Sequence, residues 1–171
     1  MKQLLRSIIL VSSLFTVNQP VVSQPNFKQE VLSAHNKYRQ EVDVPSLKWS
    51  DRLANQAQQW ADYLASLGGN QLQHDPNLSG QGENLWLGPS NRLSYTQMVD
   101  RWGREKQYFI PGLFNPNKIS STGNWSDVGH YTQIIWKNTT KLGCAISKTE
   151  KNDILICRYS PQGNIIGQPV Y

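Results

Sequence analysis

One stretch of the chain says more about the fold than any other: Gly129-His130-Tyr131-Thr132-Gln133-Ile134-Ile135-Trp136-Lys137-Asn138-Thr139. Residues 129–137 within it predict a short helix with a histidine near its start. Aromatic side chains in such a segment usually belong to the core, because they bury a large apolar area. We therefore expect Trp136 in the core, and we expect Trp125, which precedes the stretch in a long loop, to be exposed.

Two strands follow this stretch, at 142–148 and 154–159, and they flank a turn at Glu150-Lys151. A two-residue hairpin loop at that turn places Cys144 directly opposite Cys157. Opposed residues of an antiparallel pair have Cα atoms roughly 4.5–5.5 Å apart, which is near the range that a disulfide accepts. The chain has two cysteines, so they are predicted to form a disulfide; two free buried thiols are the alternative.

Three helices are predicted upstream, from apolar residues that recur at helical spacing. The first contains 27–42, the second begins at a Ser50 cap and ends at Gly68, and the third is 94–109. The segments after the second and the third helix, 70–93 and 110–128, are rich in turn-forming residues and predict loops. A short strand is expected within the first of these loops, at 85–87.

The length of the chain and its first 23 residues indicate an exported single domain. Residues 1–23 resemble a signal peptide, with basic residues, an apolar run at 8–17 and a small residue, Ser23, at the cleavage point. A membrane anchor, the alternative, needs roughly 20 apolar residues, and no later segment is long enough to span a membrane. Residues 24–171 remain as one domain, expected to be extracellular, or periplasmic in a bacterium.

Nucleic acid is not expected as a partner. The chain carries a net charge of +5, but its basic residues are scattered and form neither a block nor a stripe. The sequence predicts no oligomeric state.

Four stretches in a fixed order resemble the CAP superfamily, the cysteine-rich secretory proteins, antigen 5 and pathogenesis-related class 1 proteins. They are His35-Asn36-Lys37-Tyr38-Arg39, Gly82-Glu83-Asn84-Leu85, the stretch 129–139, and Ile156-Cys157-Arg158-Tyr159-Ser160-Pro161-Gln162-Gly163-Asn164-Ile165. The resemblance implies an α+β fold, a three-layer α-β-α sandwich with a small central antiparallel sheet, with its core motifs in 31–166. It also implies a disulfide between Cys144 and Cys157.

The resemblance further implies a cavity lined by a tetrad, which maps onto His74, Glu83, Glu105 and His130. Glu105 is informative by itself, because it belongs to the apolar stripe of the third helix, where an ionisable group needs a partner. A salt bridge without function is the alternative. His35, on the first helix, is interpreted as a structural hydrogen-bonding residue.

The tetrad has three possible roles. His74 and His130 are possible ligands of zinc, with the two carboxylates orienting the imidazoles. With a metal-bound water, Glu83 or Glu105 could be the general base of a hydrolase. The chain has no His-Glu-x-x-His helix, only two nitrogen ligands and no credible nucleophile, so we expect a polar network in a non-enzymatic protein.

Two further hypotheses concern ligands and processing. Members of the superfamily include sterol and fatty-acid binders, so the resemblance implies a sterol, a fatty acid or a cell-envelope component as ligand, in a defence- or stress-like role; 110–128 is the candidate site. The tail 161–171 resembles the signalling peptide released from plant members. Two features depart from the family pattern. Arg158 stands where Asn usually follows the cysteine, and the chain ends in Pro-Val-Tyr instead of Pro-Tyr.

Overall fold

A computed structural model describes residues 27–171, so the predicted signal peptide at 1–23 lies outside the described residues. Within that part of the chain no helix has the length and hydropathy needed to cross a membrane. The helices and strands occur in the order α1 (Phe27–Gln40), β1 (Lys48–Trp49), α2 (Asp51–Ser66), β2 (Gly82–Pro89), α3 (Tyr95–Gly103), the 3₁₀ helices η1 (Arg104–Tyr108) and η2 (Trp125–Asp127), α4 (Gly129–Ile134), β3 (Lys141–Lys148) and β4 (Asn152–Ser160).

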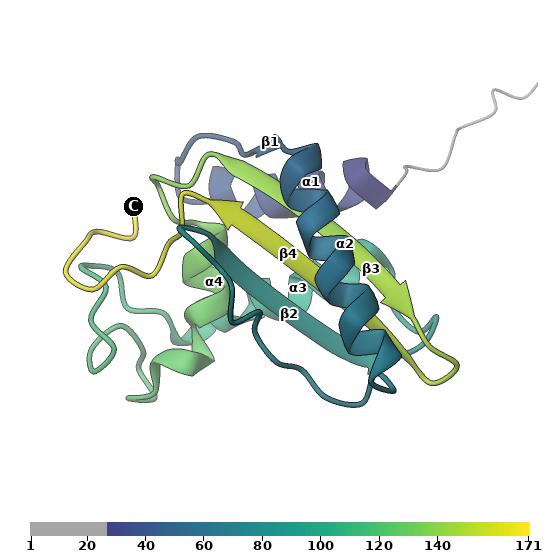
Figure 1. Ribbon diagram of the computed structural model, residues 1–171. Helices are drawn as coiled ribbons and strands as arrows, with labels where there is room; N and C mark the ends of the chain where they lie inside the picture. The colour runs from purple at the N-terminus through teal and green to yellow at the C-terminus, as the bar shows by residue number, and fades with distance from the viewer. Residues whose placement is uncertain (1–26) are drawn as a thin grey trace, which may run out of the picture.

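The sheet has four strands in the order β1-β3-β4-β2, and it lies between two layers of helices (Figure 1). The three long strands are antiparallel, as predicted. The two-residue β1 adds a parallel pairing with β3, so the sheet is mixed. The described residues therefore have the expected α-β-α sandwich.

Among the described helices only α2 covers one of the two faces of the sheet, and it lies across the front in Figure 1. The Ser50 hydroxyl caps its first turn by accepting a hydrogen bond from the Leu53 amide. The apolar side of the helix packs on β3 and β4, and the helix approaches β3 closely at Gly143. A Cβ built on Gly143 would lie 2.3 Å from the Ala54 nitrogen, so only glycine fits this contact.

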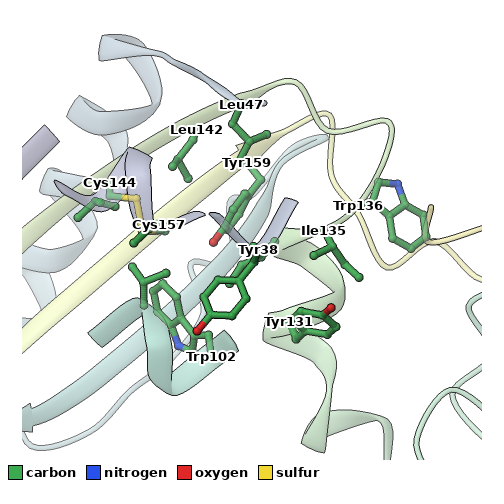
Figure 2. Packing of buried hydrophobic residues seen from close by; sticks show 14 of the residues in the cluster. Tyr38, Leu47, Trp102, Tyr131, Ile135, Trp136, Leu142, Cys144, Cys157 and Tyr159 are labelled. Carbon is green, nitrogen blue, oxygen red and sulfur yellow. A yellow bond between two sulfur atoms is a disulfide. The ribbon is translucent and has the colours of Figure 1, made fainter. Parts of the chain in front are cut away.

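Helices α1, α3 and α4 lie on the opposite face and enclose the larger hydrophobic cluster (Figure 2). Trp136 and Tyr159 are fully buried there, and the expectation for Trp136 is confirmed. The same cluster contains the disulfide between Cys144 and Cys157, as predicted. The two cysteines are paired residues of β3 and β4.

The predicted turn at Glu150-Lys151 is also confirmed. The Thr149 amide donates to the Asn152 carbonyl oxygen over 2.8 Å, which leaves the two residues between them as the hairpin loop. The register of the hairpin was predictable because it follows from the position of this one turn.

Three of the predicted helices are shorter than expected. α1 ends at Gln40, α4 ends at Ile134, and α3 ends at Gly103, after which the chain winds as 3₁₀ helix to Tyr108. A 3₁₀ helix has three residues per turn instead of 3.6, so residues beyond Gly103 leave the stripe that the sequence pattern implied. Glu105 is one of these residues, and its carboxylate contacts His130 and Tyr131 of α4.

The C-terminal tail, after β4, packs on the loop between η1 and η2. The Gly167 amide donates to the Phe114 carbonyl oxygen, and the Phe114 amide donates to that of Gln168. Val170 is fully buried, and its carbonyl oxygen accepts from the Lys137 amide. Figure 1 shows the tail running past α4 to the C-terminus.

Candidate functional site

A cavity of about 350 Å³ opens beside the first residues of β2, an edge strand of the sheet. Most of its lining residues have polar side chains, and one is a tryptophan. The lining residues are His74, Gln81, Gly82, Glu83, Asn84, Trp125, Ser126, Gly129, His130, Gln133, Gln162, Gly163 and Asn164. Three of the four residues of the predicted tetrad are among them.

Glu105, the fourth member, contacts both the imidazole and the backbone amide of His130. Its Oε1 lies 2.6 Å from Nδ1 of His130, and its Oε2 accepts from the backbone amides of His130 and Tyr131, each over 3.0 Å. These amides belong to the first turn of α4, where backbone donors have no partner within the helix. Glu105 therefore both caps α4 and orients the imidazole, which also stacks on the Trp102 ring at 5.9 Å.

His74 has a corresponding carboxylate partner in Glu83. Nδ1 of His74 lies 2.8 Å from Oε1 of Glu83, and the same oxygen accepts from the Asp75 amide over 3.1 Å. The two histidines differ in their surroundings, because the side chain of His74 is 63% exposed and that of His130 is 35% exposed. The carboxylate of Glu83 is itself fully buried.

Arg158 lies next to this second pair. Its Nη2 is 2.6 Å from Oδ2 of Asp75 and 3.3 Å from Oε2 of Glu83. Burial opposes ionisation of Asp75, but the backbone amide of Asn77 and the Arg158 guanidinium outweigh it and lower the pKa of Asp75 below its ordinary value. Asp75 is therefore a carboxylate at neutral pH.

The C-terminal tail forms part of the cavity wall. The Gly163 amide donates to Oε1 of Gln133 over 2.9 Å. Asn164 accepts from the Thr132 hydroxyl and donates to the Gly129 carbonyl oxygen. These bonds fix the tail to the first turns of α4, so the shape of the cavity depends on the tail.

The structure brings the predicted tetrad together as two imidazole–carboxylate pairs. No three of these four residues have ligand atoms within 4.8 Å of one another in the described part of the chain. His35 lies elsewhere, with Nδ1 2.8 Å from the Val31 carbonyl oxygen and Nε2 2.8 Å from the Tyr159 hydroxyl. Its predicted hydrogen-bonding role is confirmed. Trp125 is 45% exposed, as expected.

Sequence reasoning did not find several wall residues. Asn84 reaches the His130 carbonyl oxygen and the Tyr159 hydroxyl, and Gln133 fixes the tail. The available signal was their place inside the quoted motifs, next to Glu83 and His130. Asp75 and Arg158 gave no local signal of their proximity, because they are 83 positions apart.

The described fold agrees with comparisons to known proteins. A family model described as the cysteine-rich secretory protein family, CAP, matches residues 32–159. The chain belongs to the CAP family. It is 34% identical to pathogenesis-related protein 1C of Nicotiana tabacum, covering 96% of this chain and 94% of that protein. It is 37% identical to Golgi-associated plant pathogenesis-related protein 1 of Homo sapiens, covering 83% and 87%.

Solved structures show the same CAP fold. The crystal structure of NaASP2 with Zn²⁺ has a TM-score of 0.70 and 22% sequence identity, covering 89% of this chain and 88% of that one. At that identity the likeness concerns the fold.

The cavity described above has side chains whose chemistry fits a divalent transition metal. A carboxylate only accepts hydrogen bonds, so Nδ1 of His74 and of His130 each carries a proton. In the neutral form of either imidazole, Nε2 then has the lone pair that a metal ligand needs. Neither Nε2 has a hydrogen-bond partner among residues 27–171. An imidazole whose other nitrogen donates to a carboxylate is the usual form of a zinc-ligating histidine.

Proposed function

We propose that the chain is an exported, non-enzymatic CAP protein whose cavity binds a divalent transition metal, zinc above all, through Nε2 of His74 and His130. The main support is that each imidazole has a carboxylate partner at Nδ1. Glu83 accepts from His74, and Glu105 accepts from His130. Zinc bound there would supply a Lewis-acidic centre that holds an oxygen ligand. Export is supported by the disulfide and by the signal peptide predicted at 1–23.

The bonding of the carboxylates supports binding without catalysis. Both oxygens of Glu105 are engaged by hydrogen bonds to His130 and Tyr131, and Glu105 is not among the residues that line the cavity. Oε1 of Glu83 accepts two hydrogen bonds, and Oε2 faces Arg158. Catalytic zinc sites also usually have three protein ligands, and this cavity offers two imidazoles.

Zinc titration by calorimetry tests the proposal. The purified domain should bind about one zinc per chain, and His74→Ala and His130→Ala should each abolish measurable binding. Glu150→Ala, an exposed carboxylate on the hairpin turn, is the control and should bind like the parent. Absence of zinc binding in the parent chain would leave the tetrad as a structural network.

The hydrolase hypothesis is tested on the same variants. Zinc-loaded parent protein, Glu83→Gln and Glu105→Gln would be assayed on casein and on ester substrates, with and without a chelator. We expect no activity above background in any sample. Hydrolysis that is lost on chelation and in either Gln variant would contradict a non-enzymatic function.

A second candidate ligand, a sterol or fatty acid, is favoured by a different observation. Most of the large exposed hydrophobic side chains lie on the segment from η1 to η2 and on the tail: Tyr108, Ile110, Leu113, Trp125, Ile166 and Tyr171. The tail packs on this segment, so the two groups belong to neighbouring surfaces. Contiguous exposed apolar surface marks interaction sites or ligand-binding grooves, and we propose that these side chains form such a surface.

Two matched substitutions test this candidate. Leu113 is 60% exposed on the candidate surface, and Leu67 is 64% exposed at the end of α2. Leu113→Asp should weaken binding of radiolabelled cholesterol or palmitate, whereas Leu67→Asp should not. Equal effects of both substitutions, or no lipid binding by the parent, would remove the lipid hypothesis.

A further inference from the structure

Arg158 stands directly opposite Glu83 in the antiparallel pair of β2 and β4. Its side chain is only 5% exposed, so its long stem is enclosed and its charged head has few available positions. Cross-strand neighbours of opposite charge stabilise each other, and here one of them belongs to the cavity. Arg158 is also the residue that this chain has directly after Cys157, where the CAP family usually has Asn.

The guanidinium is shared between two carboxylates. Nη2 donates to Oδ2 of Asp75 over 2.6 Å and lies 3.3 Å from Oε2 of Glu83. Nε of Arg158 and Oε2 of Glu83 are buried without a hydrogen-bond partner among the described residues. The strongest contact of Arg158 is therefore with Asp75, the residue next to His74, and its charge holds Glu83 in place beside it.

The segment that carries His74 depends on these contacts for its position. Residues 67–81 contain neither helix nor strand, and His74 is mostly exposed. Its Nδ1 bond to Glu83 and the Asp75 amide bond to the same oxygen attach this part of the segment to β2. The Arg158–Asp75 bond attaches it to β4 as well.

We propose that Arg158 and Asp75 are positioning residues, which hold the His74 segment against the sheet so that His74 donates from Nδ1 to Glu83 and presents Nε2 to the cavity. His130 needs no such pair, because Glu105 is anchored by two amides of α4. The consequence for zinc affinity rests on the proposed function; the positioning itself does not.

Removal of Arg158 has a definite expected effect. In Arg158→Gln, two neighbouring carboxylates, Asp75 and Glu83, lose the cation between them and repel each other. Because Asp75 moves with the segment, the repulsion and the lost hydrogen bond both release His74 from Glu83. Arg158→Lys keeps a charge but not the planar fork, so its effect should be in the same direction and smaller.

The first measurement is long-range ¹H–¹⁵N NMR of the neutral imidazoles in metal-free protein. In the parent, His74 and His130 should both be in the Nδ1–H form. Arg158→Gln should shift His74 toward the Nε2–H form and leave His130 unchanged, which makes His130 an internal control. Arg52→Gln, the same change at an exposed position of α2, should shift neither histidine.

Hydrogen exchange at the Asp75 amide gives a second measurement on the same samples. Its exchange should accelerate at least about tenfold in Arg158→Gln, while amides of the β3–β4 hairpin keep their protection. An unchanged His74 tautomer together with unchanged Asp75 exchange would overturn the proposal. If Arg158→Gln does not fold, Arg158→Lys and Asp75→Asn carry the same comparison.

Zinc affinity then separates this inference from the proposed function. If the parent binds zinc, Arg158→Gln should weaken binding by about 10–100-fold, the usual effect of losing a residue that orients a ligand. Unchanged affinity in Arg158→Gln would overturn the positioning role at the metal site. If the parent binds no zinc, the proposed function fails, and the tautomer and exchange results still decide the role of Arg158.

Discussion

Nε2 of His35 lies 2.8 Å from the hydroxyl of Tyr159, a contact between residues 124 positions apart that joins α1 to β4 in the centre of the domain. Burial lowers the pKa of His35 from 6.5 to about 4. The hydrogen bond to the Val31 carbonyl oxygen raises this pKa, and the nearby charge of Arg39 lowers it. The folded protein therefore keeps this imidazole neutral at pH values at which the unfolded chain protonates it.

The first prediction is a loss of stability in mild acid. The unfolded state binds a proton near pH 6.5 and the folded state only near pH 4, so stability falls as pH decreases between these values and is fully present above pH 6.5. The shift corresponds to about 3 kcal/mol. Urea denaturation of the parent and of His35→Gln across this window checks it. A variant with the same pH slope as the parent would contradict the assignment to His35.

The second prediction concerns Arg39, which is fully buried. Its partners in the described part of the chain are the carbonyl oxygens of Pro45, Ile134, Trp136 and Thr139. Burial lowers its pKa to about 10, so it remains charged at neutral pH.

Arg39→Lys should cost about 3 kcal/mol or more, because an ammonium group cannot reach four divergent carbonyl oxygens and leaves buried acceptors unpaired. Thermal denaturation of this variant beside Arg52→Lys, at an exposed position, measures the difference. Equal melting temperatures would show that the four contacts contribute little to stability.

The third prediction is for the disulfide. Cys144 and Cys157 are separated by 13 positions, and closing a loop of that size stabilises a domain by about 3 kcal/mol in the chain-entropy treatment. The Cys144→Ala/Cys157→Ala double variant should lose about that much in chemical denaturation. The hairpin register should survive, as seen by cross-strand NOEs, because the turn at Glu150-Lys151 fixes it independently.

The fourth prediction tests how closely α2 approaches the sheet. Gly143→Ala places a methyl group against the backbone of α2 at Ala54, and the helix must move outward. Overpacking of this kind typically costs about 1–3 kcal/mol. Ala145→Gly, two residues along on the same strand, removes a methyl group instead and is the comparison variant. A fully stable Gly143→Ala protein would mean that α2 shifts without loss of packing.

Much of the fold was predictable because its signals are local. Ser50, the spacing of apolar residues and the Glu150-Lys151 turn each act over a few residues, so helix starts and the hairpin register followed from them. Helix ends were less predictable. α3 ends at Gly103 and continues as the 3₁₀ helix η1, whose residue Glu105 contacts α4. No pattern within the third helix reports such contacts.

The site was partly predictable for a related reason. Glu105 had a signal of its own on the third helix, but the tetrad as a set followed only from the resemblance, and its members form two pairs in the structure. The Arg158–Asp75 contact could not be predicted, because it requires the pairing of β2 with β4 to be known. Sequence spacing gives no information about an edge strand that pairs across 60 or more intervening residues.

The tail also bears on the hypothesis that a peptide is released from the C-terminus. Residues 162–164 form part of the cavity wall, and Val170 fills a place in the core. A chain cut before Pro161 gives up both. Ligand binding in the cavity and release of the tail peptide would thus exclude each other in any one molecule. The intact protein would bind the ligand, and cleavage of the tail would end that binding irreversibly.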